Sequence, residues 1–142
     1  MVVLTAISGY VAYRYWEAAH VFDAFTDQEK VEGSAVCETS NRGFKSGMRG
    51  HVYTTGGYIR YDYNVSNTDG IFISHIVMEP TGVSYGWDEG NPKGIKGSLM
   101  EMLKSVATDN LFFKEITCGP WWSPDRTIFK IPDDVEFSGM PR

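Results

Sequence analysis

The residues with the most distinctive chemistry are two cysteines and three histidines. His20, His51 and His75 lie far apart in the sequence, and neither HExxH nor CxxC nor another ligand spacing occurs around them. A zinc site needs about four ligands, usually with two of them close together in the chain. We therefore expect no metal site and no other cofactor, and we interpret His75 as a hydrogen-bonded histidine of the core.

Cys37 and Cys118 could instead act as nucleophiles or pair with each other. A catalytic cysteine needs a thiolate stabilised by a base or a cation, and neither cysteine has such a neighbour in the sequence. A disulfide needs only a fold that brings the two together. Closing so long a loop would stabilise the fold by about 4.5 kcal/mol in the chain-entropy model. We predict a Cys37–Cys118 disulfide and an oxidising, extracytoplasmic compartment, with two buried free thiols as the alternative.

Other catalytic signatures are missing from the sequence. It contains no GxSxG, P-loop or GxGxxG pattern. The acidic pairs Asp88/Glu89 and Asp133/Asp134 are typical of solvated surface, and Tyr58, Arg60 and Asp62 suggest charge pairing on a half-exposed strand face. We therefore predict that the protein is not an enzyme.

Composition limits both the size of the fold and its partners. A chain of 142 residues with 42% hydrophobic content can build one globular core. The net charge is −5, and the 13 lysines and arginines are scattered, so we expect no nucleic-acid partner.

The N-terminal segment is apolar, with no charge before Arg14. We predict a helix over 1–30 and a β-rich extracytoplasmic domain over 31–142. The uncharged part would cover about 20 Å as a helix, less than the roughly 30 Å of a bilayer core. Three hypotheses stay open: a shortened membrane anchor with an aromatic belt, a helix packed against other subunits, or a helix lying on its own domain. The candidate membrane or subunit contacts are Val2, Val3, Leu4, Ile7, Tyr10, Val11, Tyr13 and Trp16.

From residue 35 the pattern is typical of strands. Short strands are predicted at 34–40, 48–55, 58–65, 70–78 and 82–87, and Gly56-Gly57 marks a tight hairpin turn. Together they predict an antiparallel meander of about five strands. A helix should follow, because Ser98 and Glu101 fit a capping box and an apolar stripe packs it on the sheet. That stripe is Leu99, Met102, Leu103 and Val106.

Three stretches of this β-rich part resemble a known group of proteins. A cysteine on the first strand is followed by "GHVYTTGGYIRYDY", "SHIVMEPTGVSYGW" and "CGPWWSPDRTIFKIPDDVEF". This order resembles uncharacterised, membrane-anchored extracytoplasmic bacterial proteins over about residues 35–138, and these look like relatives of the outer-membrane lipoprotein carrier fold. The resemblance implies an α+β fold, in which an N-terminal apolar helix precedes a curved antiparallel sheet, an incomplete barrel, packed with one or two helices. It supplies no catalytic residue.

Two functions are consistent with these observations. The first is a helix-anchored extracytoplasmic binding or scaffold domain that holds an apolar, lipid-like ligand or a protein segment. The alternative is a structural subunit of a pilin-like filament or membrane complex, assembled through its N-terminal helix, although Thr5 replaces the glutamate customary in pilins. The candidate cavity lining is Ile73, Val83, Tyr85, Trp87, Met102 and Val106.

Overall fold

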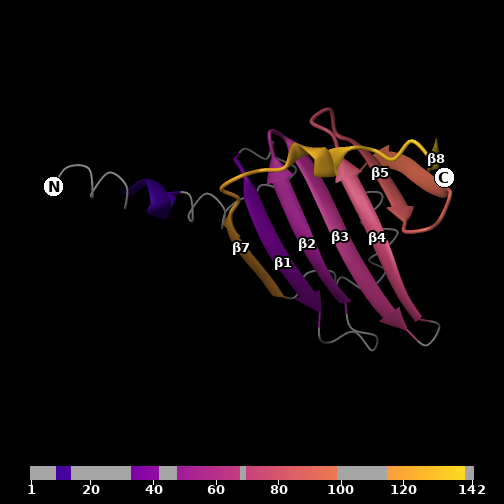
Figure 1. Cartoon of the computed structure of the whole chain (residues 1–142), viewed down its shortest axis with the longest axis horizontal. Coiled ribbons are helices and arrows are strands. Elements are labelled where there is room, and N and C mark those ends of the chain that lie inside the picture. The colour runs from indigo at the N-terminus through magenta and orange to yellow at the C-terminus, as the bar shows by residue number, and fades with distance from the viewer. Residues whose placement is uncertain (1–8, 14–32, 42–47, 68–69, 99–114, 140–142) are drawn as a thin grey trace.

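A computed structural model of the chain describes residues 9–13, 33–41, 48–67, 70–98 and 115–139. Eight strands form one mixed sheet in the order β7-β1-β2-β3-β4-β5-β6-β8 (Figure 1). The elements are β1 (Ala35–Asn41), β2 (Met48–Thr55), β3 (Tyr58–Asn67), β4 (Gly70–Met78), β5 (Val83–Asp88), β6 (Lys93–Ser98), β7 (Glu115–Pro120), the 3-10 turn η1 (Arg126–Phe129) and β8 (Glu136–Gly139).

Strands β1 to β6 are antiparallel neighbours in chain order, which confirms the predicted meander and extends it by one strand. The β2–β3 turn uses two glycines with positive φ, 59° at Gly56 and 82° at Gly57. Glycine adopts these angles without a steric penalty. The turn from β4 to β5 closes with Gly82, whose φ is 88°.

The predicted α+β class, with a long N-terminal helix, is wrong. In the described residues the helical structure is limited to η1 and a short stretch at 9–13, and no long apolar helix is present. Nor does any helix there have the length and apolar character needed to cross a membrane. The remainder of that prediction, at 1–8 and 14–30, lies outside the described residues.

The helix predicted after Ser98 lies outside the described residues, together with its whole apolar stripe, including Met102 and Val106. Ser98 itself is the last residue of β6. The sheet is also mixed and not purely antiparallel, because β8 pairs with β6 in parallel.

Residues 121–135, here called the strap, connect the two edges of the sheet. The strap leaves β7 at one edge and reaches β8 at the opposite edge (Figure 1). The ring centroids of Trp121 and Tyr53 lie 5.6 Å apart, and those of Phe129 and Tyr58 lie 5.4 Å apart. Tyr53 and Tyr58 point to the same side of the sheet. This side is called the strap face, and its buried centre includes Val77, which has no exposed surface.

The opposite side, called the Cys37 face, contains most of the buried apolar side chains, because alternate residues of each strand point there. Its buried apolar residues are Ala35, Cys37, Val52, Ile59, Tyr61, Tyr63 and Ile76. Gly50 also lies on this face. A Cβ there would come within 2.9 Å of the Tyr61 ring and 2.7 Å of the Asp62 carbonyl oxygen, so only glycine fits.

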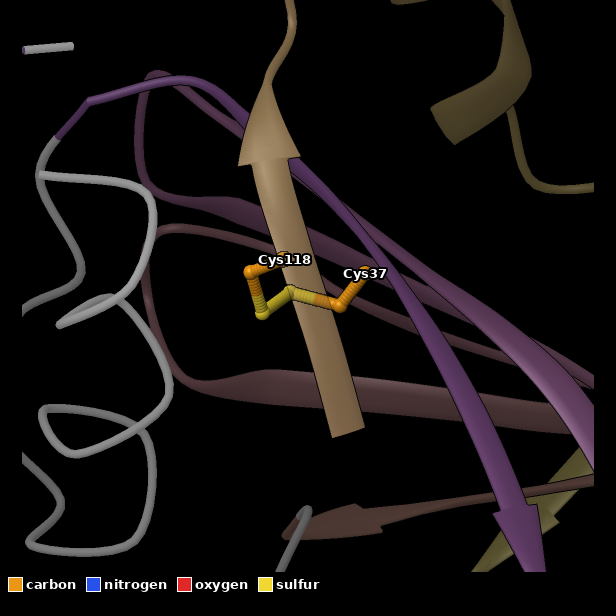
Figure 2. The surroundings of a disulfide bond; sticks show 2 residues. All are labelled: Cys37 and Cys118. Carbon is orange, nitrogen blue, oxygen red and sulfur yellow. A yellow bond between two sulfur atoms is a disulfide. The ribbon is translucent and has the colours of Figure 1, made fainter. Parts of the chain in front are cut away.

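The predicted disulfide is present on this face. Cys37 of β1 and Cys118 of β7 are directly opposed, with an S–S distance of 2.01 Å and Cα atoms 4.0 Å apart (Figure 2). It joins edge strand β7 to the meander immediately before the strap begins. The bond also indicates an oxidising environment for the domain, as disulfides persist mainly outside the cytoplasm.

Candidate functional site

A hollow of about 430 Å³ lies over strands β3 to β6 and Ser138 of β8. Register places most of the lining residues of these strands on the Cys37 face, whereas His75, Trp87 and Gly94 belong to the strap face. The lining is apolar at Tyr63, Ile76 and Ile95 and polar at one end. The polar lining residues are Ser74, Asp88, Asn91, Lys93 and Ser138.

The hollow exists because β5 presents small side chains to this face. Ser84, Gly86 and Asp88 alternate along the strand, and Gly86 is paired with Ile76 on one side and Ile95 on the other. Because Gly86 has no side chain, the surface of the sheet is lower at Gly86 than at the isoleucines on either side.

The polar end contains a hydrogen-bonded row across three strands. Tyr63, Ser74 and Asp88 are direct neighbours in the β3–β4 and β4–β5 registers. The Ser74 hydroxyl donates to Asp88 Oδ1. Burial raises the pKa of Tyr63, a side-chain hydrogen bond with Ser74 opposes that rise, and the charge of Asp88 adds to it. The row thus couples a buried phenol to a carboxylate at the surface.

The structure places the predicted cavity residues of the sheet elsewhere. Val83, Tyr85 and Trp87 alternate with the small residues of β5 and therefore point to the strap face. Tyr85 and Trp87 pack against Phe137, with centroid distances of 5.3 and 6.0 Å. Of these residues only Trp87 contributes to the hollow. Ile73, also on the strap face, is 40% exposed.

The signal that would have found the hollow is the S-x-G-x-D spacing of β5. The sequence places the small or polar residues Ser84, Gly86 and Asp88 on one face of the strand, because they alternate with Val83, Tyr85 and Trp87. Ser84 is fully buried. Small residues on a covered face indicate missing volume, and this can be read from the sequence once the covered face is known.

The predicted N-terminal contacts are described only at residues 9–13. Tyr10, Val11 and Tyr13 are exposed by 56%, 37% and 54%. The Tyr10 ring lies 6.3 Å from that of Trp122, which is itself 52% exposed. Val2, Val3, Leu4, Ile7 and Trp16 lie outside the described residues.

A second cluster, on the strap face, fastens the strap to the sheet. Arg60 Nε donates to both oxygens of Asp62, at 2.7 and 2.9 Å. Another guanidinium nitrogen, Nη1, donates to the carbonyl oxygen of Ile128 in the strap. The guanidinium also lies 6.0 Å from the centre of the Trp87 ring. One side chain therefore connects strand β3, strand β5 and the strap.

His75 completes this cluster. Its Nδ1 lies 2.7 Å from Asp62 Oδ1 and 3.3 Å from Arg60 Nη2. Arginine can only donate and a carboxylate can only accept. The shorter distance is the one to Asp62, so Nδ1 of His75 carries a proton and donates it to Asp62 Oδ1. Burial raises the pKa of Asp62, but hydrogen bonds from His75 and Arg60 and the charge of Arg60 outweigh it, so the pKa is lowered.

An aspartate–histidine pair could orient a catalytic base, but nucleophilic catalysis needs a further group. Across the described ranges, no hydroxyl or thiol is hydrogen-bonded to His75, whose ring packs 5.3 Å from Trp87. Those ranges also contain no group of three or more potential metal ligands. The geometry therefore favours a role in holding the strap.

A polar hollow of about 530 Å³ lies on the strap face, around Glu38, Arg49, His51 and Thr117. His51 Nε2 stands 3.8 Å from Glu38 Oε1, and their side chains are 50% and 79% exposed. Exposed pairs of this kind interact weakly. The hollow on the Cys37 face, with its apolar floor, is the stronger candidate for a binding site.

Comparison of the chain with protein-family models, curated proteins and solved structures finds no match.

Proposed function

We propose that the protein is a non-enzymatic extracytoplasmic binding domain, which holds an amphipathic, lipid-like ligand in the hollow on the Cys37 face. The observation that carries this proposal is a hollow of about 430 Å³ with an apolar floor and one polar end. Sites for small molecules commonly have volumes of roughly 300 to 1,000 Å³ and a mostly apolar lining with a few polar groups.

In this proposal the strap face is packed by aromatic side chains, and the Cys37 face binds the ligand. On the strap face, Phe129 and Phe137 pack against the aromatic side chains of β3 and β5. On the Cys37 face, Gly86 lines the hollow, which accommodates the apolar part of the ligand beside Ile76 and Ile95. The polar part lies toward Ser74 and Asp88.

The experiment is titration of the full chain with the uncharged fluorescent probe N-phenyl-naphthylamine. We expect saturable fluorescence enhancement and displacement of the probe by octanol. Gly86→Val places a side chain on the floor of the hollow and should abolish uptake. Gly139→Val adds the same side chain where a Cβ would meet nothing within 4 Å, so it should bind normally.

Circular dichroism of both variants checks that the sheet is intact. An intact Gly86→Val variant that still takes up the probe would contradict the proposed site. Absence of uptake by the unmodified protein would contradict the proposed function itself.

We further propose that residues 1–30 tether the domain to a membrane or to other subunits. Exposure of the aromatic rings of Tyr10, Tyr13 and Trp122 supports this role, since tyrosine and tryptophan are enriched at membrane and protein interfaces. Deleting residues 1–28 separates the two functions. A tethered binding domain becomes a free monomer that still takes up the probe, whereas a filament subunit loses its assembly.

A further inference from the structure

The direction of hydrogen bonding at the polar end of the hollow shows which ligand group fits there. Ser74 has a single hydroxyl proton, and it is donated to Asp88 Oδ1. Tyr63 is the direct neighbour of Ser74 on β3 and a side-chain hydrogen-bond partner of it. Since the Ser74 proton is donated to Asp88, the carboxylate of Asp88 is the accepting end of the row.

Asp88 has more accepting capacity than this row uses. A carboxylate accepts about four hydrogen bonds through its two oxygens. Within the described part of the chain, the Asp88 side chain accepts only from Ser74. The ion pairs found there involve other acids, namely Glu38, Asp62 and Asp133. Asp88 thus presents a carboxylate at the hollow that has no ion-pair partner among the described residues.

The remaining polar lining does not neutralise this charge. Lys93 also lines the hollow, but among the described residues its ammonium forms no ion pair with Asp88. Asn91 is oriented by the local turn. The side-chain oxygen Oδ1 of Asn91 accepts from the backbone amide of Lys93 at 3.0 Å. The backbone amide of Asn91 donates to the backbone carbonyl oxygen of Asp88 at 3.1 Å. The Asn91 side-chain oxygen is therefore engaged with the backbone.

We propose that the ligand is an amphiphile with an ammonium head group, which donates to Asp88 while its apolar body lies over Gly86 between Ile76 and Ile95. This inference rests on the proposed function, because it concerns the same hollow. A cationic donor forms a charge-assisted hydrogen bond with the carboxylate, which is roughly twice as strong as a neutral one. A carboxylate head group would meet a like charge and no donor from the Tyr63–Ser74–Asp88 row.

The test compares three ligands with the same chain and different heads, octylammonium, octanol and octanoate, by displacement of N-phenyl-naphthylamine at pH 7 and low salt. We expect octylammonium to bind about tenfold more tightly than octanol, the effect of one charge-assisted hydrogen bond at a partly exposed site. Octanoate should bind most weakly. Asp88→Asn should remove the preference for octylammonium and leave octanol affinity within about twofold.

Glu89→Gln is the matched control, because it removes one negative charge from the adjacent residue, which does not line the hollow. It should preserve the order of the three ligands. Octanol and octylammonium binding equally, octanoate binding best, or an unchanged preference in Asp88→Asn would each overturn the inference while the proposed function stands. No probe uptake at all would overturn both.

Discussion

Removal of the disulfide should be the most damaging change to this fold that leaves its core volume nearly intact. Cys37 and Cys118 are separated by 81 residues. In the chain-entropy model, opening a loop of that length lowers the free energy of unfolding by about 4.5 kcal/mol at 25 °C. Domains of this size are stable by on the order of 5 to 15 kcal/mol. The double variant Cys37→Ala/Cys118→Ala should therefore be marginally folded.

The structure adds a local reason for this sensitivity. Strand β7 is an edge strand that pairs only with β1, and the strap begins immediately after it. Without the covalent bond, backbone pairing with β1 and the ring contacts of Trp121 hold this edge. Fraying of β7 would release the start of the strap from Tyr53.

The assay is urea unfolding of the oxidised protein and of the double variant, followed by tryptophan fluorescence and circular dichroism. A lower transition midpoint with native circular dichroism before unfolding would show lost stability in a retained fold, and the slope should stay the same or rise because the opened chain exposes more surface when it unfolds. Mass measurement without reductant confirms that the starting protein is oxidised. A loss below about 1 kcal/mol would refute the reasoning, because the closed loop would then not constrain the unfolded chain as the entropy argument requires.

Three further changes test other parts of the structure. Thr54 Oγ1 is fully buried with no hydrogen-bond partner, so Thr54→Val should raise the unfolding free energy by about 1 kcal/mol. Thr55→Val, which loses the hydrogen bond between the hydroxyls of Thr55 and Ser34, should lower it, and urea midpoints measure both changes. Gly94→Ala should lower the unfolding free energy by about 1 to 3 kcal/mol in the same assay, because a Cβ at this position would lie 2.5 Å from the Phe137 ring. Gly119→Ala is the neutral control, since a Cβ there would meet no atom within 4 Å. Asp62→Asn should destabilise by about 1.5 to 3 kcal/mol at pH 7. The pKa of Asp62 is lowered in the fold, so its contribution is present above the unfolded value of 3.8 and is lost as pH falls through the folded value. The difference in unfolding free energy between Asp62→Asn and the unmodified protein should therefore shrink on acidification. A pH-independent difference would contradict this account, and so would an equal effect of Asp133→Asn at the exposed Lys130–Asp133 pair.

Hairpins were predictable because their signals are local. The prediction of a strand at 48–55 matches β2, and that at 70–78 matches β4. Gly56-Gly57 between two alternating runs identified the turn, and the structure adds a packing reason. A Cβ on Gly57 would approach Pro80 Cβ to 3.3 Å, so the turn also needs glycine for space.

Non-local pairings were not predictable in the same way. β6 contains two glycines in "KGIKGS", a composition with weak strand propensity, and it is stabilised by β5 on one side and β8 on the other. β7 follows β6 in the sequence but lies at the opposite edge of the sheet. No pattern within 115–120 specifies that position except Cys118, whose predicted bond to Cys37 already placed these two strands together.

The strap explains why the cavity was expected on the wrong side of β5. Sequence reasoning took the large apolar residues Tyr85 and Trp87 as a cavity wall, but large side chains fill space, and here Phe137 fills what they leave. The glycine and proline residues of "CGPWWSPD" send the chain across the strap face, and Trp121 packs on Tyr53 along that path. A β-strand that must be covered on both faces can enclose a ligand only where its side chains are small. In β5 the side chains are small on the Cys37 face, at Gly86. The polar residues that line the hollow beside Gly86 therefore determine which ligand head group can bind.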